Sequence, residues 1–432
     1  MDLRPYLPEF LGLIRERLSS KGIRAYLVGG CVRDLISGRS PSDWDLVVDS
    51  HLRELKELFP DRPSFQFKDM VFTTLFDRYK VEFCSLRGSD LLEDLGKRDF
   101  TMNSLALDLS TGKIHDPFGG LEDLKRGVLR TAGDPRERFG EDPLRMLRAV
   151  RFVAQLNLRP EREMVRVIMG EKAQMERVAV ERIREELKHI LLSPYPYRAL
   201  WFLFSLGLLK AQIPELWEMK GVKQSPPHRH RVLKHSLLTV KLTPPSLSLR
   251  LAALFHDIAK PKAHSFKGGR HRFFGHHILG AQMTEEILRR LRFPRESSEG
   301  IVALVRHHLV LYSPHWTDKA ILRFVERISP ASPWELLSLR RADLKAQGRN
   351  NDDLKGLDHM EKRAQVLLRG GMPKKPRPPI NGEEIMELLG IGPGPMVGKI
   401  IRGLEEWLLR HPEDREAFRL KRVIKEIYSR IK

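Results

Sequence analysis

Cysteine is scarce in this sequence. Only two of its 432 residues, Cys31 and Cys84, are cysteines, too few for the disulfide framework of a small secreted domain. No apolar run approaches the about 18 residues that a membrane-spanning helix needs. The first residues, MDLRPYLPEFLG, lack the basic start and the apolar core of a signal peptide. These absences predict a cytoplasmic protein without a membrane partner.

Negative charge is also in short supply. The sequence has 76 Lys and Arg against 56 Asp and Glu, a formal net charge of +20. Such a balance favours a polyanionic partner, although charge alone does not say which nucleic acid it would be. Hydrophobic residues make up 41% of the chain, enough to bury real cores. The length predicts two to four domains, and there is neither an internal repeat nor a long low-complexity tract.

Residues 26–48, YLVGGCVRDLISGRSPSDWDLVV, contain the densest set of functional signals. An apolar run stops at Gly29 and Gly30, a short helical pattern follows, and a second apolar run comes after Asp43 and Asp45. This order predicts a strand, a glycine turn, a helix, a turn and a strand. Glycines let backbone N–H groups approach a phosphate, and a helix N-terminus favours an anion. The two aspartates lie two apart on an extended segment, so their carboxylates face one side and suit Mg²⁺.

Each pattern alone has an ordinary explanation, a turn or a solvated loop. Together, LVGGCVRD followed by SDWDL resembles the signature of the class II nucleotidyltransferases. That family comprises bacterial tRNA CCA-adding enzymes, their CC-adding and A-adding relatives, and bacterial poly(A) polymerases. The resemblance implies an α+β fold, in which a nucleotidyltransferase α/β head is followed by an all-α neck, an HD body and a tail.

The resemblance also implies an enzyme with assigned residues. Asp43 and Asp45 would be the catalytic ligands of Mg²⁺, while Gly29, Gly30 and Arg33 would bind the triphosphate of the incoming nucleotide. The implied partners are the tRNA 3′ end, CTP and, for full CCA addition, ATP. The sequence leaves the oligomeric state open.

A second cluster, KRDFTMNSLA at 97–106, resembles the family motif in which an arginine contacts the triphosphate. That role falls to Arg98, and Asp99 and Asn103 would orient their neighbours by hydrogen bonds. Without the first motif, the cluster would be an ordinary helix N-terminus with basic residues before it. Residues 116–131 are also family-like and are expected to form a turn and a strand that close the head.

The segment between the two motifs has the composition of strands. Residues 71–76 and 80–86 predict two strands on either side of a turn. Glu82 lies in the second strand and is either a third carboxylate near the metal or an exposed strand residue.

A third cluster, EDPLRMLRAVRFVA at 141–154, predicts a helix with Pro143 in its first turn. At about 100° per residue, Asp142, Arg145 and Arg148 share one side of that helix and apolar residues occupy the other. A solvated charged face would show the same pattern. In the resembling family this motif reads the base of the incoming nucleotide, which assigns Asp142 and Arg145 to the base and Arg148 to the nucleotide nearby.

The middle of the chain has a second set of metal-ligand residues. LFHDIAKP is the signature of the HD superfamily, whose helical domains hold divalent metals and hydrolyse phosphate esters. Histidine and aspartate side chains can hold such a metal and activate water. The ligands expected for a second divalent metal are His235, His256, Asp257, His276, His307 and Asp343. The pattern alone does not decide which member of the pairs 276/277 and 307/308 is the ligand, or which ester is hydrolysed.

The expected domains are a head at 1–134, a neck with the base-reading helix at 135–222, an HD domain at 223–370, and a linker with a helical tail at 371–432. GMPKKPRPP at 371–379 has the composition of a linker. In the tail, a turn at 392–395 followed by Lys399 predicts either an RNA phosphate contact or a plain brace between two helices.

The length of one connection bears on the product. Enzymes of this family that add the whole CCA usually have a flexible loop before the Arg-Asp motif, and that loop is associated with the switch from C to A addition. Here only residues 88–96 separate strand and motif. We therefore expect CC addition ahead of full CCA addition. A poly(A) polymerase, or an HD phosphohydrolase whose head only binds RNA, is the alternative.

Overall fold

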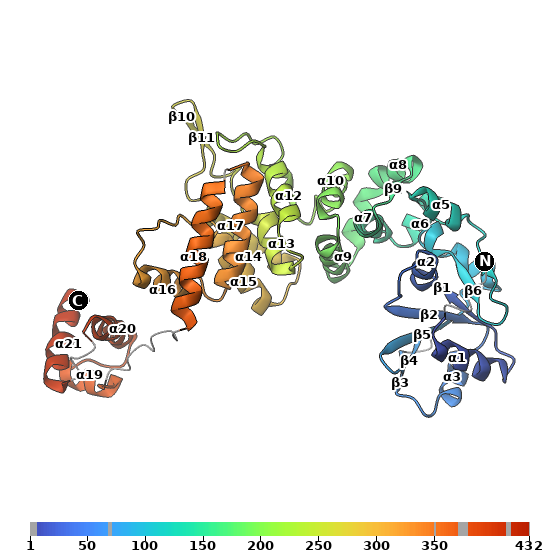
Figure 1. Ribbon diagram of the computed structural model, residues 1–432, viewed down its shortest axis with the longest axis horizontal. Coiled ribbons are helices and arrows are strands. Elements are labelled where there is room, and N and C mark those ends of the chain that lie inside the picture. The colour runs from blue at the N-terminus through green and yellow to red at the C-terminus, as the bar shows by residue number, and fades with distance from the viewer. Residues whose placement is uncertain (1–6, 68–70, 350, 370–378, 412–415, 432) are drawn as a thin grey trace. The chain divides into compact units, whose positions relative to one another are not determined.

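The computed structural model describes residues 7–67, 71–349, 351–369, 379–411 and 416–431 (Figure 1). The predicted linker at 371–379 lies almost wholly outside these residues. By their contacts the residues form two compact units. One contains the chain up to Leu311 together with Ile328–Lys355, and the other contains Tyr312–Arg327 together with the chain from Gly356 onward. The predicted boundaries of the four domains stay predictions.

The head is built on a seven-stranded sheet with the strand order β3-β4-β5-β2-β1-β6-β7. Its strands are β1 Ala25–Val28, β2 Asp43–Val48, β3 Ser64–Phe67, β4 Val71–Phe76, β5 Tyr79–Ser85, β6 Ala106–Asp108 and β7 Ile114–His115. Among the described strands of this sheet, only β2 and β5 pair in parallel, and their register sets Asp45 opposite Glu82. Both strands predicted between the motifs, β4 and β5, are therefore present, with the turn between them.

The two faces of the sheet bury different partners because side chains alternate along each strand. On one face, Trp44, Leu46 and Val48 pack with α1 (Glu9–Ser19) and α3 (Leu52–Leu58) in the main core of the head. On the other face, Val28 and Val47 pack with α4 (Leu91–Gly96). Helix α2 (Gly30–Ile36) follows β1 directly, and α4 precedes the short turn η2 (Thr101–Asn103). The alternation thus places the predicted motifs between two apolar cores, one on each face of the sheet.

The segment predicted as a turn and a strand, 116–131, also contains a helix. It forms a turn, then α5 (Gly120–Arg126), then β8 (Val128–Leu129). Glycines with positive φ flank the helix at positions 119 and 127, where the chain enters and leaves it. The expectation of only a turn and a strand was therefore incomplete.

Helices make up the rest of the first unit. The neck elements are α6 Pro135–Glu141, α7 Arg145–Leu156, β9 Arg159–Pro160, α8 Arg162–Glu171, η3 Lys172–Arg177, α9 Val180–Leu192, α10 Pro196–Leu206 and α11 Pro214–Glu218. The HD body has α12 Val232–Leu242, α13 Leu247–Phe255, the hairpin β10 Ser265–Lys267 and β11 Arg270–Arg272, α14 His276–Arg290, α15 Arg295–His307 and α17 Pro333–Gln347. Helix α7 packs on both α9 and α10, and α12 packs on α13 and α17.

The second unit contains α16 Asp318–Arg327, most of α18 Asn351–Arg369, and the tail helices α19 Gly382–Leu389, α20 Pro395–Arg410 and α21 Ala417–Ile431. The tail has its own apolar core around Ile385, Ile400 and Leu404. A capping box formed by Asn381 and Glu384 begins α19. Within the residues described, no helix is both long and apolar enough to cross a membrane.

Candidate active site

The glycine turn after β1 brings the backbone close to an arginine. Gly29 has φ +75°, a conformation that L side chains rarely adopt, and a Cβ there would lie 3.2 Å from a guanidinium nitrogen of Arg98. Gly30 begins α2, and Arg33 lies one turn along that helix. The turn therefore lets two arginines from different motifs lie beside the same stretch of glycine backbone.

The carboxylates of the first motif lie on β2 as predicted. Asp43 is exposed at the start of the strand, and Asp45 is half-buried two residues later, on the same side. Burial raises the pKa of Asp45, and the nearby negative charges of Glu82 and Asp43 raise it further, while Arg98 opposes them. Lys80 lies 2.5 Å from Glu82 and neutralises part of this charge. Such crowding of carboxylates is what a bound divalent cation would relieve, so the donor set fits one.

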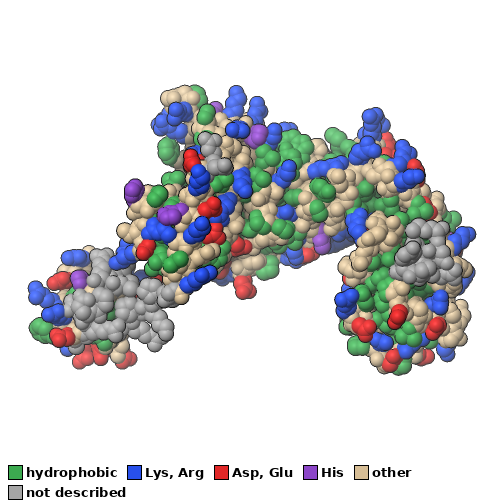
Figure 2. Space-filling view, in the orientation of Figure 1, with side chains coloured by type: hydrophobic (Ala, Val, Ile, Leu, Met, Phe, Trp, Pro, Cys, Tyr) green, Lys and Arg blue, Asp and Glu red, His purple; other side chains and the backbone are tan. Residues whose placement is uncertain are grey.

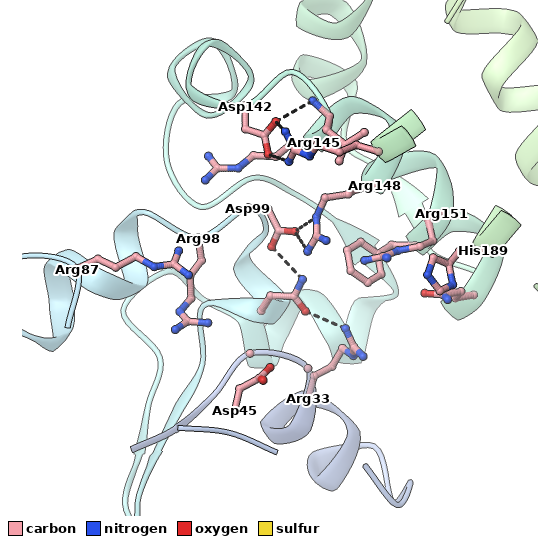
Figure 3. Close-up of a pocket in the computed structure, with 17 residues that line it drawn as sticks. Arg33, Asp45, Arg87, Arg98, Asp99, Asp142, Arg145, Arg148, Arg151 and His189 are labelled. Atoms are coloured by element: carbon pink, nitrogen blue, oxygen red, sulfur yellow. Dashed lines mark hydrogen bonds and ion pairs between the residues drawn. The ribbon is translucent and has the colours of Figure 1, made fainter. Parts of the chain in front are cut away.

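A cavity of about 460 Å³ opens beside Asp45 (Figure 3). Seven arginines line it, against three aspartates. All the predicted nucleotide-binding residues line it: Gly29, Gly30, Arg33, Arg98, Asp142, Arg145 and Arg148. Asp43 and the candidate third carboxylate, Glu82, are not part of the lining. An excess of fixed cations around one carboxylate suits a polyphosphate held with a metal ion.

Arg98 owes its position to a residue that the sequence reasoning missed. The guanidinium donates two hydrogen bonds to Asp94, at 2.9 and 3.0 Å, and Asp94 is completely buried. Asp94 also accepts a hydrogen bond from the backbone N–H of Arg87, another arginine of the cavity. The four-residue spacing of an acid and a base on a short helical segment was the available signal.

Asp99 joins the head to the neck. Its carboxylate accepts hydrogen bonds from Arg148 at 2.8 Å and from the side-chain amide of Asn103 at 2.9 Å. Asn103 in turn accepts from Arg33 at 2.8 Å. Although burial opposes ionisation, Arg148 and these hydrogen bonds lower the pKa of Asp99, so it stays charged. The predicted orienting role of Asp99 and Asn103 is confirmed at the level of hydrogen bonds.

The predicted base-reading helix starts later than expected. Helix α7 begins at Arg145, and Asp142 precedes it with an extended backbone, φ −149° and ψ 98°. Pro143 and Leu144 form a turn, because the backbone N–H of Arg145 bonds to the carbonyl oxygen of Asp142. Asp142 is therefore not on the helix, and the 100° spacing does not set its direction. It reaches the cavity from the end of α6.

Both base-reading candidates are engaged by the protein itself. Arg182 of α9 donates to both carboxylate oxygens of Asp142, at 2.8 and 3.2 Å. Arg145 donates to Glu141 at 2.6 Å and to two carbonyl oxygens, those of Lys97 and Arg138. Helix α9 also brings the buried Glu186 within 3.3 Å of Arg151. No sequence motif indicated these residues of α9, because their partners lie about 40 positions earlier in the sequence.

A second cluster lies in the HD body. Within the described part of the chain, two groups of possible metal ligands share one residue: His235, His256 and Asp257 form the first, and Asp257, His276 and His308 the second. The Nε2 atoms of His235 and His256 are 3.2 Å apart, and Asp343 lies 3.0 Å from His235. Five of the six predicted ligands are therefore brought together.

The sixth prediction, His307, is corrected by the structure. His307 ends α15 and is only half-buried, whereas His308 is buried and lies in the cluster. Adjacent helical residues point about 100° apart, so only one of a tandem pair can face the cluster. In the other pair, the buried His276 is the one that does.

Hydrogen bonds orient three histidines of this cluster so that their Nε2 atoms can bind a metal. The Nδ1 atoms of His256, His276 and His308 each lie 2.7–2.8 Å from a backbone carbonyl oxygen three residues earlier. A carbonyl oxygen only accepts, so Nδ1 has the proton and Nε2 offers its lone pair. Burial lowers the pKa of His308 well below its usual value and keeps that imidazole neutral. The Nε2 of His276 is buried without a hydrogen-bond partner, so the site fits a metal ion.

Comparison with known proteins agrees with this geometry. Family models match at residues 25–90 and 74–130 (Poly A polymerase head domain), 157–220 (Probable RNA and SrmB-binding site of polymerase A) and 230–343 (HD domain). An A-adding tRNA nucleotidyltransferase of Deinococcus radiodurans is 35% identical over 400 residues, 88% of this chain and 91% of the relative. This chain belongs to the tRNA nucleotidyltransferase family. It is an enzyme, and both the nucleotidyltransferase and the HD families depend on divalent metal ions.

Two further similarities extend over most of the enzyme. A CC-adding tRNA nucleotidyltransferase of Thermus thermophilus is 35% identical over 404 residues, 88% of this chain and 89% of the relative. The crystal structure of a Bacillus stearothermophilus CCA-adding enzyme in complex with CTP covers 98% of both chains with a TM-score of 0.70 and 24% identity. The last comparison establishes the fold, a head followed by helical neck, body and tail.

Replacing Asp43 or Asp45 with alanine is expected to abolish nucleotide addition while tRNA binding stays largely intact. The two carboxylates are the metal ligands we assign, whereas affinity for RNA depends on basic residues across the chain. Primer extension with labelled CTP and filter binding of tRNA measure the two properties. A loss of tRNA binding as large as the loss of activity would contradict the assignment.

Asp94→Asn is expected to raise KM for every nucleotide by about 10- to 100-fold, because hydrogen bonds to a charged group contribute about 1.5–3 kcal/mol. Arg98 would lose its anchor, and the contact that we expect it to make with the triphosphate would not depend on the base. Steady-state kinetics with CTP and ATP measure the effect. Glu93→Gln is the matched control, since Glu93 is exposed on the same helix and binds Lys97 instead. Equal effects of both variants would remove the positioning role from Asp94.

Proposed function

We propose that this enzyme adds cytidylates to the 3′ end of tRNA without a nucleic-acid template and stops at CC. Relatives of nearly equal similarity are named A-adding and CC-adding, so similarity does not decide the product. The observation that carries the proposal is the short connection between β5 and Arg98. It contains a turn and α4, with no further segment that corresponds to the flexible loop of CCA-adding enzymes.

That connection is closely held at both ends. Asp90 caps α4 by accepting the backbone N–H of Glu93 at 2.9 Å, and Glu93 binds Lys97 at 2.6 Å. Glu93 also accepts the backbone N–H of Ser89 at 2.8 Å. With Asp94 buried beneath Arg98, most of the segment is engaged in local contacts. Such a segment supports one fixed arrangement of the cavity and not a switch between two bases.

The reaction we propose joins the tRNA 3′-hydroxyl oxygen to the α-phosphorus of CTP and releases pyrophosphate. Arg33 and Arg98 would hold the triphosphate by charge-assisted hydrogen bonds, with the backbone of Gly29 and Gly30 beside it. Asp43 and Asp45 would hold Mg²⁺, which would activate the hydroxyl and neutralise charge on the α-phosphate and the leaving pyrophosphate.

Base selection would depend on Asp142 and Arg145. A carboxylate accepts from the exocyclic amino group of cytosine, and an arginine donates to a ring acceptor. Uracil presents the wrong group to the carboxylate. Arg182 grips both oxygens of Asp142, which supports a charged and oriented carboxylate. Arg148 would contact the nucleotide between these readers and the phosphate arginines.

We also propose a second activity, metal-dependent hydrolysis of phosphate esters at the HD site. The supporting observation is the pair of ligand groups that share Asp257. His235, His256, Asp257 and Asp343 would hold one divalent metal, and His276 with His308 would extend the site on the other side of Asp257. A metal there would activate water.

Placement of the enzyme in the cytoplasm stays a prediction.

Two alternatives remain from other classes. A poly(A) polymerase would share the head, although the HD cluster and the tail favour the tRNA enzyme. An HD phosphohydrolase whose head only binds RNA would not need the aspartate pair, the arginine lining or the Asp142–Arg182 pair. The completeness of those sets favours a head that does chemistry.

With CTP alone, the enzyme is expected to add two C residues to a tRNA that ends at its discriminator base and then to stop. With ATP also present it should add little or no A, because the segment before Arg98 is too short to supply the loop. Gel analysis of labelled tRNA resolves the products. Efficient terminal A addition would overturn the CC-only proposal in favour of full CCA addition. Exclusive A addition to a tRNA that already ends in CC would assign the A-adding class.

Arg145→Ala is expected to weaken the use of CTP about tenfold or more and to let UTP or GTP compete, because a site that hydrogen-bonds a base edge loses discrimination without its polar partner. Arg98→Ala should weaken all four nucleotides alike. The ratio of kcat/KM values for CTP and UTP measures selection. An unchanged ratio in Arg145→Ala would remove the template role from this region.

A double variant, His256→Ala with Asp257→Ala, is expected to lose metal-dependent phosphoesterase activity and to keep C addition. The two clusters lie in separate parts of the fold, so their chemistry should separate. Hydrolysis of phosphate esters with added divalent metal and primer extension measure the two activities, and circular dichroism checks folding. If the folded double variant stopped adding C, the two-site proposal would be wrong.

A further inference from the structure

A cavity of about 520 Å³ opens over the HD cluster, and cationic and aromatic side chains outside the cluster also line it. Asp257, His276, His308 and Asp343 form its floor. One wall comes from the hairpin β10–β11 and from the residues that lead out of it into α14. The volume is in the range of pockets that hold one nucleotide-sized ligand.

The charges that line the cavity favour an anion. Among the described residues that line it, the carboxylates are the two of the metal cluster, and five side chains are cationic: Lys260, Arg270, Arg272, Arg340 and Arg349. Arg340 is only 8% exposed and donates to Asp343 at 2.5 Å, yet its Nε has no hydrogen-bond partner. Lys260 lies 2.7 Å from Asp257. Lys260 also donates to the side-chain oxygen of Gln224 at 2.6 Å. A phosphate group next to the metal ligands would satisfy the Nε of Arg340 and would lie beside the charge of Lys260.

The mouth of the cavity offers a flat apolar surface. Phe274 lines the cavity with 76% of its surface exposed, and the guanidinium of Arg272 lies 6.0 Å from the centre of its ring. The hairpin is anchored to the loop before α12, since the backbone N–H of His271 donates to the Ser225 hydroxyl at 2.8 Å. Gly275 and His276 follow Phe274 directly, so aromatic ring and cluster histidine lie on one short segment.

An exposed aromatic ring beside an arginine is a usual platform for a nucleobase. Other large apolar side chains are exposed on the chain, but Phe274 combines exposure with a cavity that contains cations and metal ligands. Figure 2 shows Lys and Arg side chains among hydrophobic ones at the top of the view, where Figure 1 draws the hairpin.

We propose that Phe274 and Arg272 form a base-stacking subsite of the HD cavity, which selects ribonucleotides with a terminal phosphate as the ester that the metal site hydrolyses. The inference rests on the proposed phosphohydrolase function and names its substrate class. The same chemistry is offered by a free nucleoside monophosphate and by an RNA strand that ends in a 3′-phosphate.

The reaction is a hydrolysis and needs no further reactant. A bond forms between the oxygen of water and phosphorus, and the bond between phosphorus and the ribose oxygen breaks. One proton of the water passes to the ribose oxygen, so the products are a free ribose hydroxyl and inorganic phosphate. Lys260 and Arg340 would hold the phosphoryl oxygens while the base stacks on Phe274.

The test compares Phe274→Ala with Phe266→Ala. Phe266 is 61% exposed on the same hairpin but is not among the residues that line the cavity, which makes it a matched control. Every protein also carries Asp43→Ala and Asp45→Ala, so that the head contributes no chemistry. Hydrolysis of adenosine 3′-monophosphate, of a short RNA ending in a 3′-phosphate, and of glycerol 2-phosphate is measured with added Mn²⁺. Quenching of 2-aminopurine riboside 3′-monophosphate reports stacking independently of turnover.

Phe274→Ala is expected to raise KM for both ribonucleotide esters about tenfold, to leave glycerol 2-phosphate unchanged and to abolish the quenching, while Phe266→Ala changes none of these. The larger kcat/KM among free nucleotide and RNA identifies the source of the substrate. Equal effects of Phe274→Ala on all esters, or no effect on any, would overturn the subsite.

If the parent hydrolyses no ester with any divalent metal, the proposed phosphohydrolase function fails by itself. The quenching then decides the subsite: loss in Phe274→Ala alone supports base stacking, and absence of quenching in the parent overturns it.

Discussion

Mutual repulsion among cations is the constraint on which the nucleotide cavity depends. Seven arginines surround a space of about 460 Å³, and without acidic partners their side chains would repel one another and turn away from the cavity. All seven have an acidic partner within 4 Å in the described structure: Arg33–Asp34, Arg87–Asp94, Arg98–Asp94, Arg145–Glu141, Arg148–Asp99, Arg151–Glu186 and Arg182–Asp142. Each carboxylate fixes a guanidinium without blocking all five of its donors. The cavity is therefore organised for a polyphosphate before one arrives.

The same pairs hold the catalytic region together. Asp99 is buried where the head meets the neck and binds Arg148 of α7 as well as Asn103 of η2. Asp142 is held by Arg182 from α9. The phosphate side and the base side of the cavity thus belong to different elements, which these charge pairs and the contact between the Phe100 and Phe152 rings, 5.5 Å apart, hold in register. This explains why the residues that position the site outnumber those that would touch the nucleotide.

The HD site follows another principle. Its ligands come from five helices or their ends, and each of three histidines is oriented by a hydrogen bond from Nδ1 to the backbone three residues earlier. For His256 and His308 that bond comes with the helix that ends there, and for His276 it comes with the turn before α14, so none of the three depends on distant residues. The cluster is also buried, whereas the head carboxylates stay partly open. A buried site of histidines and aspartates suits firm metal binding, and an open carboxylate pair suits an ion that arrives with its nucleotide.

Motifs whose parts are close together in the chain were predictable from the sequence. The Gly29–Gly30 turn and the Asp43–Asp45 pair depend only on backbone freedom and on the two-residue period of a strand, so their relation was readable directly. The family resemblance added the fold of head, neck, HD body and tail. What the sequence could not supply were partners joined only by folding, such as Asp94 beneath Arg98 and Arg182 on Asp142.

Tertiary structure decided the positions that the periodicity of a helix in the sequence leaves ambiguous. The start of α7 was misplaced because Pro143 is compatible with a helix's first turn and with the turn before it, and only packing separates the two. Of the two adjacent histidines, 307 and 308, the sequence could say that one faces the cluster, since neighbours on a helix point about 100° apart. Which one it is depends on how α15 is rotated against α13 and α14. The sequence by itself thus determined the residue types and local geometry of both sites, and the packing of helices decided which side chains complete them, because contacts between distant segments exist only in the folded chain.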